Sequence, residues 1–320
     1  MSHATKIWLG IAFALILIGG LLFVGVMSML KWDFTKLSTV KYETNTHEIS
    51  EGFSSIAVNT ETANIVFVPT ADAACSVVCH EQTNMKHAVS VKDGVLTIEV
   101  VDTRKWYEYI GISFTSPKLT VTIPAGEYAS LALHTDTGSV EIAKDFSFES
   151  MDVSGHTGTV TNHASVAGEI RIKTTTGGIR VESASAGSLA LSVSTGAIYV
   201  SDVAVSGDAS VNVSTGKTVL TRVTCGSLTS KGSTGDIHME DVIASGRFSI
   251  ERDTGDVRFS HCDAAEISVR TDTGDVKGSL RTPKVFDVHT DTGRREYPNT
   301  VTGGRCEIRT DTGDIQITLD

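Results

Sequence analysis

The sequence predicts an all-β protein: a β-solenoid (parallel β-helix) of about ten coils, with an N-terminal β cap and one N-terminal transmembrane helix. Three observations predict this fold. A Thr-Gly turn recurs every 19 or 20 residues, hydrophobic residues alternate on both sides of each turn, and no proline lies between Pro124 and Pro283. A fixed period of this length is the signature of stacked repeats, and proline would interrupt their strand ladders.

These patterns divide the chain into three regions. Residues 1–33 hold a short tail and the transmembrane anchor, residues 34–130 the β cap, and residues 131–320 the solenoid. The 320 residues have 40% hydrophobic and 20% charged side chains, as expected of a globular protein rather than a disordered one. The net charge of −11 argues against binding to nucleic acid, which needs lysine and arginine at the phosphates.

The anchor is predicted from an uncharged stretch, residues 7–30. As a helix it would be roughly 36 Å long, enough to cross the hydrocarbon core of a bilayer and contact membrane lipid. A cleaved signal peptide has a shorter apolar run of about 7–15 residues and a small-residue cleavage site, so we expect an uncleaved anchor. The stretch is bracketed by charged and interfacial side chains: Lys6, Trp8, Lys31 and Trp32.

The orientation of the anchor is less directly encoded. Lys31, Lys36 and Lys41 follow the apolar stretch, and only Lys6 precedes it, so a simple charge count would keep the large domain inside the cell. Long domains are nevertheless translocated largely regardless of flanking charge. We therefore expect a single-pass protein of the cell membrane whose C-terminal domain is extracytoplasmic.

Alignment of the coils on their turn glycines shows the predicted core. Positions 7 and 5 before the glycine and 2 and 4 after it are mostly aliphatic, which is the period-two alternation of strands with one face inside. Around Gly196, for example, these residues are Leu189, Leu191, Ile198 and Val200. The aligned glycines are Gly138, Gly158, Gly177, Gly196, Gly216, Gly235, Gly255, Gly274, Gly293 and Gly313. Near Gly274 and Gly293, Gly278, Arg295 and Tyr297 break the columns and predict irregular coils.

The cap region lacks the turn motif, but its short apolar runs predict β-strands. These strands form either a separate cap or degenerate coils continuous with the solenoid. Asp93-Gly94 between two short apolar runs predicts a hairpin. A long connection carries Trp106, Tyr107 and Tyr109, which either form a binding tip or pack over the cap; we expect packing.

The motifs Asp93-Gly-Val-Leu-Thr-Ile and Leu119-Thr-Val-Thr-Ile-Pro, followed by serial Thr-Gly-Asp turns, resemble a bacterial family of unknown function with β-strand repeats. Its members are often named "putative adhesins", and the resemblance covers about Phe53 to Asp320. It implies a right-handed β-helix exposed at a bacterial surface, and some members are encoded beside envelope-stress signalling systems. The family has no established catalytic residues, so it transfers none.

The tripeptide Asp-Thr-Gly, which forms the active site of aspartic proteases, occurs five times. A protease needs two such loops whose carboxylates share a proton. Equivalent turns carry Thr175, Ser194, Ser214 and Ser233, which keep the turn but abolish carboxylate chemistry, so the position serves the turn. The five aspartates are Asp136, Asp253, Asp272, Asp291 and Asp311.

Calcium is the competing interpretation of the acidic turns. Two columns of carboxylates are expected along the solenoid edge, and a cation would relieve their repulsion. Arg294 interrupts the second column, however, so we expect carboxylates that only face solvent, and the calcium question stays open. The columns are Asp253, Asp272, Asp291 and Asp311, and then Asp236, Asp256, Asp275 and Asp314.

The five cysteines cannot all pair. Cys225, Cys262 and Cys306 occupy hydrophobic columns and are predicted to be small buried residues. Cys75 and Cys79 are expected on one face of a strand, either buried or redox-linked. Together with His80 they give too few ligands for a metal site. We assign no catalytic, cofactor-binding or metal-ligating residue.

The function predicted from the sequence is a non-catalytic binding or scaffold module, adhesin-like, at the cell envelope. Its expected partners are a cell-wall polymer, a surface ligand or a membrane protein. The chain stops at Asp320 directly after a strand, so we also expect an open last coil, available for end-to-end self-association through Ile317. The alternatives are an accessory component of envelope-stress signalling and a polysaccharide-active enzyme.

Overall fold

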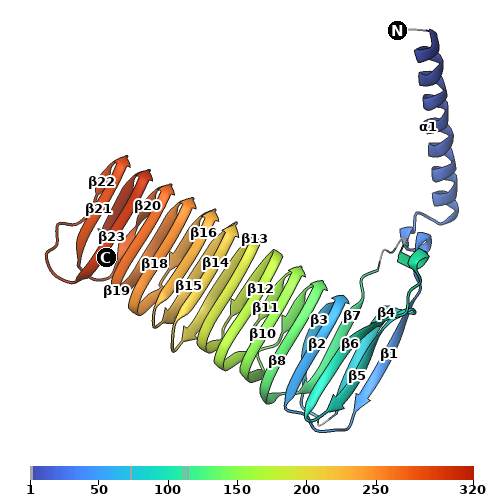
Figure 1. Cartoon of the computed structure of the whole chain (residues 1–320), viewed down its shortest axis with the longest axis horizontal. Helices are drawn as coiled ribbons and strands as arrows, with labels where there is room; N and C mark the ends of the chain where they lie inside the picture. Colours follow the sequence, from blue (N-terminus) through green and yellow to red (C-terminus); the bar gives the residue numbers. More distant parts are fainter. Residues whose placement is uncertain (1–2, 73, 110, 112, 114) are drawn as a thin grey trace.

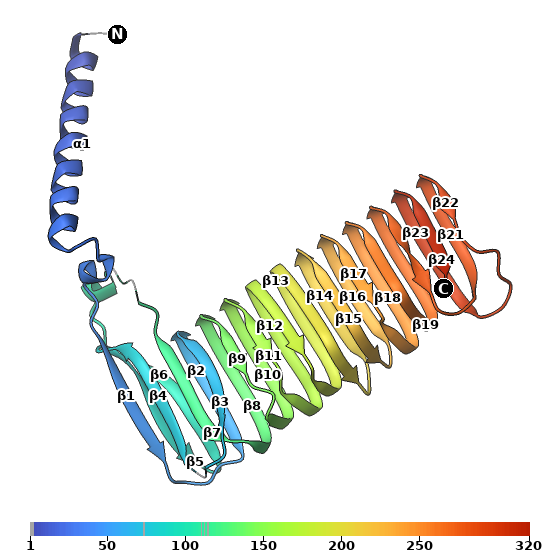
Figure 2. The same ribbon diagram turned by 180° about the vertical axis from the view of Figure 1, so that it is seen from behind.

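The computed structural model describes residues 3–72, 74–109, 111, 113 and 115–320. It forms a long stack of strands with one helix standing off its N-terminal end, as Figures 1 and 2 show from opposite sides. The predicted fold class is confirmed: the strands join in one continuous 24-stranded sheet that winds as a β-solenoid.

The helix α1 (His3–Met29) has an apolar, uncharged body and is almost entirely exposed; Met27 is its one buried residue among those described. Its length and composition fit a membrane anchor or a signal sequence alike. It ends where Lys31 and Trp32 adopt positive φ and their backbone N–H groups bond back to the carbonyls of Ser28 and Met27. The short 3-10 helix η1 (Phe34–Leu37) leads from there to the first strand.

The cap region contains seven strands and a second 3-10 helix. They are β1 (Tyr42–Ile49), β2 (Ser55–Thr62), β3 (Asn64–Thr70), β4 (Cys75–Gln82), β5 (Met85–Lys92), β6 (Val95–Asp102), η2 (Trp106–Tyr109) and β7 (Lys118–Pro124). The Asp93-Gly94 hairpin is confirmed, since β5 and β6 pair antiparallel and both turn residues have positive φ. The polar strand β1, which pairs antiparallel with β4, was not predicted because it has no hydrophobic alternation.

The solenoid strands stack in parallel along the rod. Its first half comprises β8 (Gly126–Thr137), β9 (Val140–Ile142), β10 (Phe146–Thr157), β11 (Val160–Asn162), β12 (Ser165–Glu182), β13 (Ser185–Val205), β14 (Ala209–Thr215) and β15 (Thr218–Cys225). The second half comprises β16 (Leu228–Thr234), β17 (Ile237–Glu240), β18 (Ile243–Thr254), β19 (Val257–Thr273), β20 (Val276–Leu280), β21 (Lys284–Thr292), β22 (Arg295–Glu296), β23 (Gly304–Thr312) and β24 (Ile315–Leu319).

The predicted core columns are confirmed by the strand register. Met151 pairs with Leu131 on one side and Ile170 on the other, and all three are buried. The turn needs glycine for two reasons. Gly196 has a φ of 147°, and a Cβ there would lie 1.5 Å from the carbonyl oxygen of Gly177 in the adjacent coil.

A second recurrent turn lies six residues after the glycine and was not predicted. Its residues adopt positive φ without being glycine, and they are Ser183, Asp202, Arg222, Asp241 and His261. This turn could not be recognised as a sequence motif, because its backbone conformation repeats but its residue type does not.

Residues 55–70 form a further coil within the predicted cap region. β2 pairs in parallel with both β6 and β8, and β3 pairs with both β7 and β9. This coil therefore lies between two later segments of the chain. Its turn carries Ala63 where the other coils have glycine.

The opposite end of the rod corrects the prediction of an open last coil. β23 pairs with both β19 and β21, and β24 with both β20 and β22, so the last coil in sequence is not the last in space (Figure 1). Ile317 is only 2% exposed and cannot mediate end-to-end contacts. The coil that ends the rod holds Arg295 and Tyr297, two of the residues that break the core columns.

Candidate functional site

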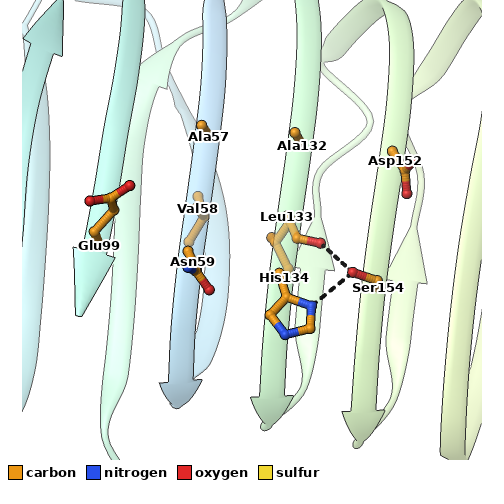
Figure 3. A pocket seen from close by; sticks show the side chains of 9 residues that line it. All are labelled: Ala57, Val58, Asn59, Glu99, Ala132, Leu133, His134, Asp152 and Ser154. Atoms are coloured by element: carbon orange, nitrogen blue, oxygen red, sulfur yellow. Dashed lines mark hydrogen bonds between the residues drawn. The ribbon is translucent and has the colours of Figure 1, made fainter.

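A shallow pocket lies on the outer face of the sheet near the N-terminal end of the rod (Figure 3). The strands β6, β2, β8 and β10 run side by side there, and their register places Glu99, Asn59, His134 and Ser154 in one row. Alanine side chains form the floor, since Ala57 and Ala132 are neighbours in register. The lining residues are Ala57, Val58, Asn59, Glu99, Ala132, Leu133, His134, Asp152 and Ser154.

His134 is the most fixed polar group of the pocket. Its Nδ1 lies 3.0 Å from Ser154 Oγ, and that hydroxyl donates in turn to the carbonyl of Leu133 at 3.4 Å. The dashed lines in Figure 3 mark both interactions. This arrangement orients the imidazole ring and leaves Nε2 facing away from Ser154.

Two groups of side chains have the composition and spacing to hold a metal ion among the described residues. One is exposed at the edge of the pocket: His134, Asp136 and His156. The other is buried in the cap: Cys79, Glu81 and His87. Neither group was predicted from the sequence, because the ligands of each group come from different strands and are not all close together in sequence.

The buried group is internally saturated with hydrogen bonds. Glu81 accepts from the backbone N–H of His87 at 2.7 Å, contacts the Nδ1 of that histidine at 2.7 Å and accepts from Asn45 at 2.8 Å. The other ring nitrogen of His87 lies 2.9 Å from Thr60 Oγ1. Burial and the nearby Glu81 carboxylate raise the pKa of the Cys79 thiol to about 12. The hydrogen bonds of Glu81 and His87 thus join β4 and β5 to β1 and β2 in the interior of the cap.

His80, which the sequence analysis considered beside Cys75 and Cys79, lies elsewhere. It points to the opposite face of β4, stacks on Tyr42 and contacts Thr44. Cys75 and Cys79 are both buried, which is the first of the two alternatives expected for them. All five cysteines are free thiols, and burial raises the pKa of Cys225 and Cys262 to about 11.

The second acidic column forms a ladder to the backbone. The Oδ1 atom of Asp236 accepts from the N–H of Asp256 at 2.9 Å, and the Oδ1 atom of Asp256 accepts from the N–H of Asp275 at 3.0 Å. The ladder continues from Asp275 through Asp314 to the N–H of Arg294. Arg294 therefore ends the column instead of interrupting it, because its coil is the last in space. Each step uses one carboxylate oxygen to hold two coils together.

The Asp-Thr-Gly aspartates are spread over separate coils. Asp291 lies 2.9 Å from the Nε2 of His289, and Asp136 lies 2.9 Å from the Nδ1 of His156. Asp272 lies 3.8 Å from the Nε of Arg270, so the partner of each of these three carboxylates is a histidine or an arginine. The turn role that the sequence predicts for this position stays a prediction.

The aromatic segment of η2 corrects another expectation. Trp106 is 79% exposed, and Tyr107 and Tyr109 are also exposed, so the rings do not pack over the cap. The Tyr109 hydroxyl donates to Asp102, and the guanidinium of Arg104 lies over the Tyr109 ring. The segment borders residues 39–41 of the linker that follows α1.

Comparison with known proteins agrees with this architecture. The family model described as Toastrack DUF4097 matches residues 53–217 and 217–320. No protein of curated function matches the chain.

Solved structures with a similar arrangement have low sequence identity to this chain. A putative adhesin from Parabacteroides merdae has 8% identity and a TM-score of 0.37, covering 87% of this chain and 96% of its own. A putative adhesin from Bacteroides fragilis has 13% identity and a TM-score of 0.34, covering 87% and 97%. A putative lipid binding protein from Parabacteroides distasonis has 15% identity and a TM-score of 0.34, covering 86% and 97%. At these scores the structures support no statement about ligands of this chain.

Proposed function

The chain belongs to the Toastrack DUF4097 family, and from this premise we propose that it is a membrane-anchored, non-catalytic binding or scaffold module of the cell envelope, adhesin-like in its mode of action. The rod would hold its polar outer face away from the membrane and present it to a cell-wall polymer or surface ligand.

The observation that carries this proposal is the outer face of the middle coils. Ser192, Ser210 and Asn212 project from neighbouring strands β13 and β14, whose backbone is fixed by parallel pairing on both sides. Hydroxyl and amide groups at a regular spacing suit a polymer that repeats along its own length. A rigid surface of this kind binds without ordering loops, which lowers the entropic cost of association.

The anchor supports a location at the membrane. α1 exposes apolar side chains along nearly its whole length, and a lipid environment would cover them. The domain that follows would lie outside the cytoplasm, where a binding module for envelope polymers has its ligand.

The test is photo-crosslinking in intact cells of the native host. A photoreactive residue replaces Ser192 on the face of the middle coils, and a matched variant carries it at Thr229, on the same outer face further along the rod. Capture of envelope polymer, identified by mass spectrometry, supports the proposal. Release of new glycan ends by the full-length protein would instead support an enzyme and contradict it.

A second candidate is favoured by one specific observation. Trp106, Tyr107 and Tyr109 are exposed beside the linker that follows α1, where a membrane-protein partner would meet the domain. In this case the protein would be an accessory component of envelope-stress signalling. Stoichiometric capture of one membrane protein from position 107, with none from position 192, would favour signalling over adhesion.

A further inference from the structure

We propose that His134, Asp136 and His156 form a surface binding site for a divalent transition-metal ion, with Zn²⁺ as the representative ion. The site lies at the edge of the pocket in Figure 3 and does not depend on the proposed function. Two imidazoles and one carboxylate are the ligands that zinc and its neighbours in the first transition row use in proteins.

The coil period brings the three side chains together. His134 and Asp136 are two residues apart on β8 and therefore share its outer face. In the register of β8 and β10, Ser154 lies opposite His134 and Thr157 opposite Thr137, which places His156 opposite Asp136. Residues 22 positions apart in sequence thus become neighbours on one surface.

The distances are close to those of a metal site. Asp136 Oδ1 lies 2.9 Å from His156 Nδ1 and 3.5 Å from His134 Nε2, and all three ligand atoms lie within 4.8 Å of one another. Ligands at about 2.0–2.1 Å around a tetrahedral ion are separated by roughly 3.4 Å. Small side-chain rotations would therefore accommodate the ion, and no backbone movement is needed.

The surroundings of His134 resemble the support that metal ligands usually have. Ser154 Oγ lies 3.0 Å from Nδ1, so the opposite nitrogen, Nε2, is the one directed toward Asp136. A hydrogen bond on one ring nitrogen that fixes the other for coordination is the common outer-shell arrangement of histidine ligands. The two imidazole rings lie nearly perpendicular, with centroids 6.1 Å apart.

The three ligands remain accessible to solvent. The side chains of His134, Asp136 and His156 are 47%, 51% and 63% exposed. An ion held by three protein ligands on an open surface keeps at least one position for water or for a ligand group of a partner. The site would therefore be of the open kind rather than a closed structural one.

The chain contains a natural control at the other end of the rod. His289 and Asp291 have the same two-residue spacing and lie 2.9 Å apart. On the neighbouring strand β23 the register places Arg309 opposite His289 and Asp311 opposite Asp291, and Asp311 is the counterpart of His156. Among the described residues, His289, Asp291 and Asp311 do not bring three ligand atoms within 4.8 Å of one another, so this pair lacks a third donor in reach.

The experiment is calorimetric titration of ZnCl₂ into the full-length protein in detergent, purified without a histidine tag and stripped with a chelator. We expect one Zn²⁺ per chain. His156→Ala and Asp136→Asn should each weaken binding at least tenfold, and His289→Ala should leave it unchanged. Because these side chains are exposed, the variants should keep the parent's circular dichroism spectrum.

Three outcomes would overturn the proposal. They are the absence of stoichiometric binding, equal binding by His156→Ala and the parent, and loss of binding in His289→Ala. The variant Cys79→Ser separates the buried group from the exposed one. Loss of zinc binding in Cys79→Ser, with binding retained in His156→Ala, would assign the ion to the cap and contradict the surface site.

Discussion

The interior coils and the two ends of the rod differ in the order in which their coils stack. Each interior coil lies between the coils that precede and follow it in sequence, and its turn requires glycine. At both ends a coil is inserted out of sequence order: residues 55–70 lie between two later segments of the chain, and residues 304–319 lie between the coil that precedes them and the coil before that one. Both ends also contain a close contact between an acidic and a basic side chain: Glu81 with His87, both buried, and the buried Lys284 with the partly exposed Asp263. The repeat pattern therefore describes a residue only where identical coils lie on both sides of it.

The largest effect should come from the interior turn. Gly196→Ala introduces a Cβ that lies 1.5 Å from the Gly177 carbonyl oxygen at a φ of 147°, and we expect a loss of roughly 4 kcal/mol in the free energy of unfolding. The matched variant is Ala63→Gly in the inserted N-terminal coil, which should cost less than about 1 kcal/mol. Chemical unfolding of the full-length protein, followed by circular dichroism, measures both. Similar losses in the two variants would break the distinction between interior and end.

The N-terminal end is tested through its buried pair. Glu81→Ala leaves the backbone N–H and the Nδ1 of His87 without their acceptor and removes one of the two hydrogen bonds of the Asn45 amide, which should cost about 3 kcal/mol. Hydrogen exchange should accelerate in β4 and β5 but not in β21–β24. The control Glu99→Ala removes an exposed carboxylate from the neighbouring β6 and should change neither.

The C-terminal end should respond less strongly. Lys284→Met removes the 2.7 Å contact with Asp263, but Asp263 keeps its bonds to Thr282 and to the backbone N–H of Ala264. Asp263 is also partly exposed, so we expect about 1–2 kcal/mol instead of the larger cost of a fully buried pair. Exchange should rise in β21 and β23 alone. Faster exchange along the whole rod would show that the two ends are coupled.

The smallest effect concerns the acidic ladder, which marks the C-terminal half. Lys277 and the backbone N–H of Asp314 lower the pKa of Asp275 below its usual value. A lowered folded-state pKa stabilises the protein above the unfolded pKa, near pH 4, and the stabilisation is lost as the pH falls further. Asp275→Asn should therefore cost less than about 1 kcal/mol at pH 7 and a smaller amount at pH 2.

Thermal unfolding at the two pH values checks this expectation. The N-terminal half provides the reference, since the equivalent ladder positions there carry Asn64 and Ser139, which accept the same kind of bond without charge. A variant of Asn64 should show the same stability change at both pH values. A pH-independent effect of Asp275→Asn would contradict the assignment.

The sequence predicted the interior of the rod well because each coil obeys the same steric rule. It predicted which residues face the core, the hairpin at Asp93-Gly94 and the burial of Cys225, Cys262 and Cys306. It did not predict the inserted coils, because the spacing of core residues within a coil is the same whatever its position along the rod. The N-terminal inserted coil was further hidden by Ala63, which avoids the glycine requirement because the chain leaves the stack between β6 and β7 beside it.

At some core positions the sequence departs from the aliphatic pattern, but the sequence alone does not explain why. Ser230 and Thr218 interrupt aliphatic columns, and Gly232 lies two residues after the first of them. The structure explains all three: the buried side chain of Arg252 fills the space, donates to both hydroxyls and approaches Gly232 closely. Burial lowers the pKa of Arg252 to about 10. The aligned core positions show where a large aliphatic side chain is replaced by a smaller residue. They do not show which residue of a neighbouring coil fills the space.

The candidate metal ligands were missed for a related reason. His156 and Asp136 occupy the same position relative to their turn glycines, 20 residues apart, and His134 lies two residues before Asp136. Reading the aligned coils across as well as along the chain would have found them. Only the structure shows that Ser154 orients the ring of His134.

The insertion of the final coil also bears on how the protein is made. During synthesis β21 and β22 leave the ribosome before β23 and β24, yet in the finished rod the later pair separates the earlier one from β19 and β20. If each coil were added in the order of its synthesis, β21 and β22 would stack directly on β19 and β20 and leave no place for β23 and β24. Residues 284–296 can therefore take their final position only together with or after residues 304–319, so the order of coils along the rod differs from the order of their synthesis.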